Sequence, residues 1–247
     1  GMPERFMRGI EAVNGIVWGP MGLGLLFGTG LLLTVRTGGF QLRRWGYWMR
    51  HTLGAILTDR SVTAHTAREE QAISQFQSLC TALASTIGTG NLVGVATAIL
   101  SGGAGAVFWM WVTALLGAST SFVESTLAQK YRVPDPLYGG WRGGPAYYLH
   151  VLAERKRGKK LRRSVCAALF AVSGLICWCG ISQVISNSVA SSFKNAFSIP
   201  PLYTSIMLVI LSAIIVLRKN ATVKVLDFIV PVMAVCYFFI TLFIIAV

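Results

Sequence analysis

Six apolar stretches, almost free of charged side chains, recur along the 247 residues of the chain. An α-helix needs about 20 apolar residues to cross a hydrocarbon core of roughly 30 Å, and these stretches are of about that length. With 54% hydrophobic and 13% charged residues, the chain also carries too little charge for a soluble domain of this size. We therefore predict an all-α, polytopic helical membrane protein. The predicted spans are Ile16–Val35, Phe76–Leu100, Ala106–Gln129, Val165–Ser191, Leu202–Leu217 and Val225–Val247.

The basic residues indicate how these spans are oriented. With six spans the connecting segments alternate between two sides, and 19 of the 22 Lys and Arg residues fall on one side. The positive-inside rule makes that side cytoplasmic, so the N-terminus is expected outside the plasma (inner) membrane. The basic run Arg155–Arg163 lies next to the span that begins at Val165, where topology and anionic lipid explain it better than nucleic acid does. We expect membrane lipid, and no nucleic acid, as a partner.

The second apolar stretch is interrupted at its middle by the sequence STIGTGN, residues Ser85–Asn91. Each of its two glycines destabilises a helix by about 1 kcal/mol, and hydrocarbon has no water to bind the backbone groups that a break releases. Polar side chains at this depth usually mark a site, and here they are Ser85, Thr86, Thr89 and Asn91. A helix broken at mid-membrane presents free amides and free carbonyls, with which secondary transporters bind an anionic group beside a cation. We expect this cluster to be the functional centre.

Helix packing is a different interpretation of the same glycines. Gly90-xxx-Gly94 has the spacing at which membrane helices approach closely, as do Gly15/Gly19 and Gly24/Gly28 in the first span. On this alternative the protein is a non-transporting membrane scaffold or receptor. A passive channel is a third hypothesis, which is disfavoured because the chain shows one broken helix and no repeated filter loop.

Polar residues in two further spans are also candidates. Gln183 and Asn187, in the outer half of the fourth span, are four residues apart and share a helix face. They suit either hydrogen bonding between helices or a substrate cavity. Glu124 in the third span suits either a paired structural carboxylate or a proton or cation relay. The sequence has no nucleotide-binding loop, catalytic triad or histidine spacing for a metal, so we expect no enzyme activity.

Five blocks of the sequence match one family in order. They read NGIVWG at 14–19, FQSLCTALA at 76–84, IGTGN at 87–91, AVFWMW at 106–111 and GGPAYY at 143–148. Over nearly its whole length the chain resembles the alanine/glycine:cation symporter family, also called the sodium:alanine symporters. This resemblance implies a LeuT-type fold, in which two five-helix repeats of inverted topology here follow one extra helix.

The resemblance divides the chain into three parts. Residues 1–35 would form an N-terminal extracellular segment and the extra transmembrane helix, and residues 36–75 a cytoplasmic loop along the inner membrane surface. Residues 76–247 would form the first five-helix repeat. The second repeat of the same transporter is then an expected partner, and we expect the chain, which stops at Val247 inside an apolar stretch, to be a fragment.

The resemblance also implies a substrate and a coupling ion. The backbone amides of Thr89 and Gly90 would bind the carboxylate of an amino acid. The backbone carbonyls of Ala84 and Ile87 would bind sodium, with further ligands from the second repeat. We therefore predict a secondary active symporter that imports a small neutral amino acid, alanine or glycine, with sodium by alternating access.

Four further residues are assigned less directly. Thr86 and Asn91 match positions that line another ion site in related sodium symporters, and Gln183 and Asn187 would line the substrate cavity. The family carries Gln-x-Asn in this span, and alignment on Asn187 puts Ile185 at the glutamine. Because two helical residues correspond to about 200° of rotation, Gln183 is expected to reach the substrate only where the helix is irregular.

Overall fold

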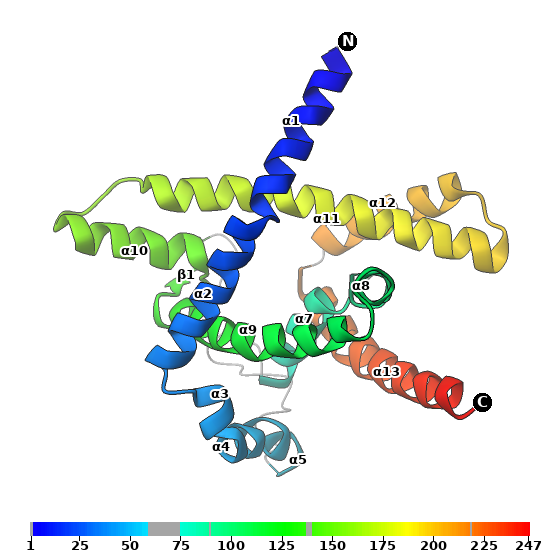
Figure 1. The fold of residues 1–247 in the computed structure, drawn as a ribbon, viewed down its shortest axis with the longest axis horizontal. Helices are drawn as coiled ribbons and strands as arrows, with labels where there is room; N and C mark the ends of the chain where they lie inside the picture. Colours follow the sequence, from blue (N-terminus) through cyan, green and yellow to red (C-terminus); the bar gives the residue numbers. More distant parts are fainter. Residues whose placement is uncertain (1, 59–74, 89, 137–139, 218) are drawn as a thin grey trace.

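The computed structural model describes residues 2–58, 75–88, 90–136, 140–217 and 219–247, nearly all of them helical (Figure 1). The helices are α1 Met2–Val17, α2 Pro20–Arg36, α3 Phe40–Arg43, α4 Trp45–Met49, α5 Ala55–Thr58, α7 Gln75–Thr86, α8 Val95–Gly102, α9 Gly105–Lys130, α10 Pro145–Arg157, α11 Val165–Phe197, α12 Pro201–Leu217 and α13 Lys219–Ala246. Two π-helical segments are η1 Arg50–Gly54 and η2 Gly90–Gly94. Two short antiparallel strands, β1 Val133–Pro134 and β2 Trp141–Arg142, connect α9 to α10.

Every predicted apolar stretch falls on a helix. The helical segments within the described residues that are long and apolar enough to span a bilayer are Pro3–Arg36, Gly105–Lys130, Val165–Phe197 and Phe228–Ala246. The bent pair Ser78–Thr86 and Gly90–Gly102 is a fifth candidate span, and α12 is a shorter apolar helix of 17 residues. The described chain is therefore that of a multi-pass helical membrane protein, as predicted.

The first predicted span, Ile16–Val35, belongs to a longer bent rod made of α1 and α2 (Figure 1). Pro20 starts α2, because a residue without an N–H is tolerated in the first helical turn. A Cβ atom at Gly19 or Gly22 would collide with carbonyl oxygens in the last turn of α1. The bend therefore requires glycine at both positions.

α2 and α9 approach each other closely at Gly30. A Cβ atom there would lie 3.0 Å from both the Cβ and the carbonyl oxygen of Leu116. Beside it Ser119 is 1% exposed, and its Oγ lies 2.7 Å from Leu116 O and 3.0 Å from Gly30 O. Thr34 Oγ1 lies 2.7 Å from Gly30 O and 3.0 Å from Ser119 Oγ. Close backbone approach and shared hydroxyl groups thus hold α2 against α9.

The glycine pairs that suggested packing in the sequence do not form this contact. Gly19 lies at the bend, and no described atom lies within 4 Å of a Cβ atom placed at Gly15, Gly24 or Gly28. The face that α2 turns toward α9 contains Gly30 instead. Four residues before it lies Leu26, and four residues after it lies Thr34.

The remaining helices pack in pairs. α7 lies against α13, where Cys80 and Val230 are buried. α11 and α12 form a helical hairpin in which Ala190 and Thr204 are buried, and α10 runs back along α11. On α3, Phe40 stacks on Phe122 of α9 with ring centroids 4.5 Å apart.

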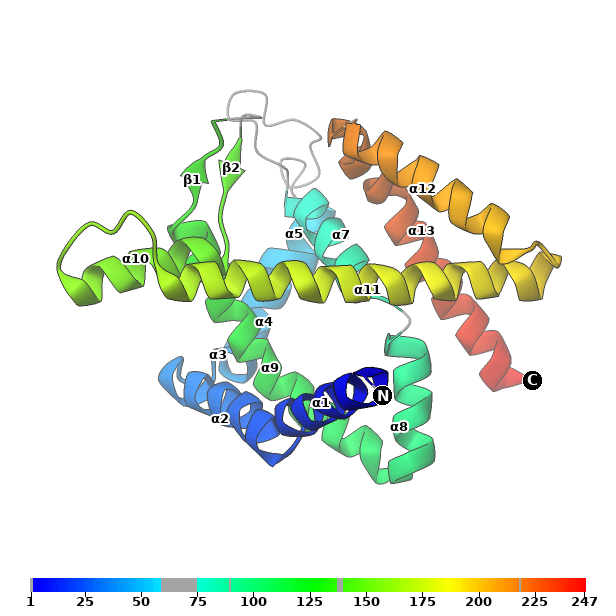
Figure 2. The ribbon, with the colours of Figure 1, turned by 90° about the horizontal axis from the view of Figure 1, so that it is seen from above.

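These pairs do not close around one core (Figure 2). The accessible surface is 19,723 Å², whereas a compact soluble protein of 26.7 kDa would expose about 10,700 Å². Among the described apolar side chains, those classed as buried are Cys80, Ala190 and Val230. Most apolar side chains therefore face the surroundings of the chain.

We expect Gly30→Val to destabilise the protein, because the added atoms would push α2 away from Leu116. Overpacking of this kind costs about 1–3 kcal/mol, which lowers the melting temperature by about 2–4 °C per kcal/mol. Gly28→Val is the matched control, since it puts the same side chain in the same helix where no described atom lies within 4 Å of the Cβ. Thermal unfolding in detergent would contradict the proposed α2–α9 contact if the two variants melted together.

Candidate functional site

The second predicted span is broken where the sequence analysis placed the break. α7 ends at Thr86. The helical i to i−4 hydrogen bonding extends one residue further, to Ile87 N, which donates to Leu83 O at 2.8 Å. The chain then bends by 54° before Gly90–Gly102, and Ile87 and Gly88 belong to no helix. A continuous helix through this segment is therefore excluded.

Side chains at the break bind the end of α7. Ser85 Oγ and Thr86 Oγ1 both donate to Ala82 O, at 2.8 and 2.7 Å. Asn91 Nδ2 donates to Thr86 O at 2.9 Å, and Asn91 N donates to Gly88 O at 3.1 Å. Asn91 thus links the two halves of the broken helix, a role that the sequence analysis did not assign to it.

The break leaves backbone groups of both kinds without a partner in the described chain. No described residue donates a hydrogen bond to Ala84 O or Ile87 O, and none accepts one from Gly90 N. Ile87 is 41% exposed, and Gly90 is exposed as well. Thr89, the other predicted substrate ligand, lies outside the described residues. A free amide beside free carbonyls suits an anion and a cation bound next to each other.

The glycines of the break do not pack against another helix of the described chain. A Cβ atom placed at Gly88, Gly90 or Gly94 would have no described atom within 4 Å. The packing interpretation of Gly90-xxx-Gly94 therefore finds no support within the part of the chain that the structure describes.

Gln183 and Asn187 are not brought to the break. Both are exposed on α11, and the helices that α11 packs against are α10 and α12. Nearby hydroxyl groups bind within the helix, as Ser186 Oγ does to Ser182 O at 2.7 Å. A place in the substrate cavity stays a prediction for these two residues.

Glu124 lies near an aromatic hydroxyl group of α10. Burial raises the pKa of Tyr148, and the negative charge of Glu124 raises it further. Tyr148 is therefore a neutral phenol at physiological pH, which can lie beside a carboxylate without repulsion. The structural and the relay interpretations of Glu124 both stay predictions.

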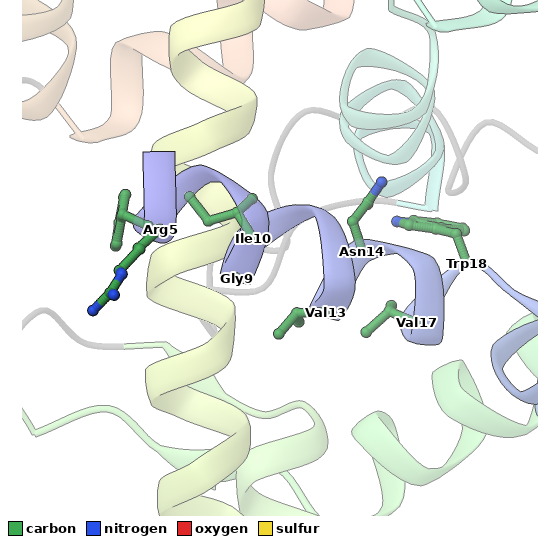
Figure 3. Close-up of a pocket in the computed structure, with 8 residues that line it drawn as sticks. Arg5, Gly9, Ile10, Val13, Asn14, Val17 and Trp18 are labelled. Atoms are coloured by element: carbon green, nitrogen blue, oxygen red, sulfur yellow. The ribbon is translucent and has the colours of Figure 1, made fainter. Parts of the chain in front are cut away.

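A hollow along α1 is a second concave surface, but a weak candidate for a binding site (Figure 3). It is lined by α1 and by Trp18, which follows α1 directly. Asn14 and Trp18 extend to one side of this helix, and Val13 and Val17 to the other (Figure 3). A single helix cannot enclose a small molecule, so the break remains the candidate site.

Comparison with known proteins identifies the family of the chain. The sequence profile of the sodium:alanine symporter family matches residues 4–247. The chain is 42% identical over 235 residues to a protein of Methanococcus maripaludis described as the sodium/alanine symporter AgcS, covering 94% of this chain and 49% of that one. No solved structure matches the chain significantly.

Two relatives from Bacillus subtilis are each 37% identical. One is described as a putative sodium/proton-dependent alanine carrier protein, YrbD, and the match covers 96% of this chain and 45% of that one. The other is described as a probable sodium/glutamine symporter, GlnT, with 96% and 46% covered. The chain spans about half the length of the curated relatives it matches. With a profile match over nearly all of its residues, this chain belongs to the sodium:alanine symporter family, a family of symporters rather than enzymes.

Proposed function

We propose that the chain is part of a secondary active symporter that imports alanine or glycine together with sodium by alternating access. The observation that carries this proposal is the broken helix α7–η2–α8, in which Gly90 N, Ala84 O and Ile87 O have no hydrogen-bond partner among the described residues. Family membership supplies the class of substrate and the coupling ion.

In this proposal the amides of Thr89 and Gly90 bind the carboxylate of the amino acid. Gly90 starts the half-helix η2–α8, whose dipole is positive at that end and favours an anion. The carbonyls of Ala84 and Ile87, just before the break, bind sodium, which prefers oxygen ligands of this kind. The sodium ion and the substrate carboxylate would then attract each other, because their ligands lie only a few residues apart in the sequence.

Thr86 and Asn91 would line a second ion site. The Thr86 hydroxyl donates to Ala82 O, and the Asn91 amide donates to Thr86 O, so each keeps an oxygen with which it can face a cation. Gln183 and Asn187 would complete the substrate cavity from α11 when that helix lies closer to the break.

The wider architecture proposed is a LeuT-type fold. Residues 1–35 give the extra helix with an outer N-terminus, residues 36–75 a cytoplasmic loop, and residues 76–247 the first five-helix repeat. The relatives are about twice as long, so we propose that their remaining half corresponds to a second repeat, which supplies the other ligands of both sites. The large exposed apolar surface of the chain agrees with such a partner.

The driving force is sufficient without ATP. A neutral amino acid that enters with one sodium ion moves one positive charge inward, which a potential of 100 mV favours by about 2.3 kcal/mol. This energy alone corresponds to roughly fifty-fold accumulation.

Uptake of radiolabelled alanine into proteoliposomes tests the coupling. With the whole transporter, an inward sodium gradient should raise the initial rate at least tenfold over an equal choline gradient, because sodium occupies the carbonyl site beside the substrate. A proton gradient is measured in parallel, and excess glycine and glutamine are tested as competitors. Equal rates in sodium and choline would contradict sodium coupling, and competition by glutamine alone would contradict the small substrate.

Gly90→Ala tests the site against the packing alternative. The Cβ atom would enter open space in the described chain, so the variant should fold and melt as the parent does. It should bind alanine at least tenfold more weakly, because the methyl group would lie where the carboxylate approaches the amide. Gly94→Ala, also in open space but at the end of η2, is the control and should bind normally. A Gly90→Ala variant that failed to fold would support packing instead.

A further inference from the structure

The junction between α10 and α11 contains a hollow of about 560 Å³ that the proposed transport mechanism does not use. Three basic side chains line it, Lys156, Arg157 and Arg163. Its other walls are mostly apolar and come from both helices and from the connection between them, including Leu149, Leu152, Leu161 and Val165. The hollow therefore combines a positive rim with an apolar wall.

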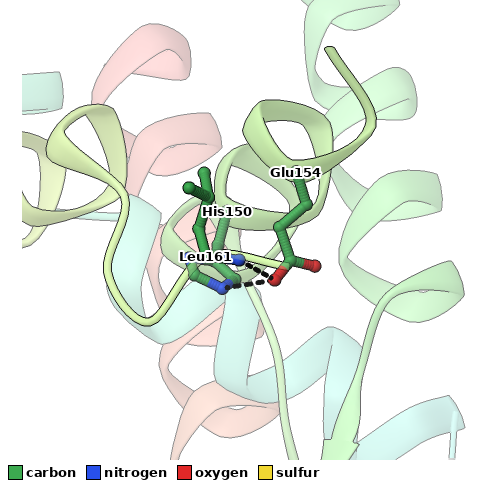
Figure 4. A network of polar contacts seen from close by, with 3 residues as sticks. All are labelled: His150, Glu154 and Leu161. Carbon is green, nitrogen blue, oxygen red and sulfur yellow. Dashed lines mark hydrogen bonds and ion pairs between the residues drawn. The ribbon is translucent and has the colours of Figure 1, made fainter. Parts of the chain in front are cut away.

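A carboxylate fixes the shape of this hollow (Figure 4). Glu154 Oε1 accepts a hydrogen bond from Leu161 N at 2.9 Å and lies 3.4 Å from His150 Nε2. These contacts tie the connection back onto α10, and Gly158, with a φ of 63°, lets the chain turn there. The loop is thus held in place before any ligand binds.

The electrostatic balance at the hollow is strongly positive. Residues 145–166 contain seven Lys and Arg side chains and one carboxylate, which is Glu154. Glu154 is engaged with Leu161 and His150, and none of the seven cations forms an ion pair with a carboxylate of the described residues. An anionic ligand would therefore meet a large excess of positive charge, with Glu154 as the one opposing carboxylate of residues 145–166.

The hollow also lies at a defined depth. Val165 and Cys166 in its wall are the first two residues of α11, which is a candidate membrane span of 33 residues. The start of a spanning helix lies at the level of the lipid headgroups. Leu152 is 59% exposed and Val165 is 71% exposed, so part of the apolar wall is open to the surroundings of the chain.

We propose that this hollow binds the headgroup of an anionic phospholipid. Its phosphate would lie among Lys156, Arg157 and Arg163, and the first part of an acyl chain would lie along Leu152 and Val165. A free phosphate ion would use the basic rim but not the apolar wall, which is why the structure favours a lipid. Basic residues near an anionic membrane surface each contribute about fivefold in affinity.

Titration of the purified transporter in detergent with dioctanoyl phosphatidylglycerol tests this proposal. We expect saturable binding of one lipid to each protomer. Dioctanoyl phosphatidylcholine, which has the same chains and no net charge, should bind at least tenfold more weakly. Inorganic phosphate at the same concentration should not displace the bound lipid. Equal binding of both lipids, or full displacement by phosphate, would overturn the proposal.

Two triple variants separate a site from a diffuse charge effect. The first removes the rim of the hollow by Lys156→Gln, Arg157→Gln and Arg163→Gln. The second removes the same charge from neighbouring residues that do not line the hollow, by Lys159→Gln, Lys160→Gln and Arg162→Gln. The rim variant should lose at least tenfold in affinity for phosphatidylglycerol, and the second variant less than threefold. Equal losses would show that the positive charge acts without a site, and melting curves verify that both variants fold.

Discussion

A backbone N–H or C=O without a partner costs several kcal/mol in hydrocarbon, and this cost governs the middle of the second span. The break after Thr86 leaves Gly90 N, Ala84 O and Ile87 O without a partner among the described residues. Asn91 reduces the cost by binding Thr86 O, and so holds the two half-helices at a fixed bend. The groups that are left over need a ligand, and a zwitterion with a cation matches them in charge.

The rest of the described chain has a tightly packed helix pair, α2 and α9, and large exposed apolar surfaces. α2 and α9 are held by close backbone approach at Gly30 and by the hydroxyl groups of Ser119 and Thr34. α9 in turn contacts α8, the helix that follows the break. Elsewhere the helices pack in pairs and leave apolar faces uncovered, which lipid and the proposed second repeat would cover.

Features that depend on local chemistry could be predicted from the sequence, and features that depend on which helix faces which could not. Apolar length located all six helical stretches, and two glycines among hydroxyl residues located the break. The helix of residues 2–17 was not expected, because its mixed charged and apolar residues give no apolar run. Spacing favoured Gly24 and Gly28 for packing, whereas the orientation of α2 put Gly30 against Leu116. Likewise, Gln183 and Asn187 share a face of α11 as predicted, but their spacing does not show which helix or cavity that face contacts.

Hydrogen–deuterium exchange of the backbone amides at residues 86–92, in the whole transporter, tests the central claim most directly. Amides of a broken helix without partners exchange quickly, whereas those inside α9 exchange slowly. Fast exchange is expected at the break in the absence of ligands. Alanine and sodium together should slow it at least tenfold, while α9 stays unchanged. Exchange as slow as that of α9, and indifferent to both ligands, would contradict the account.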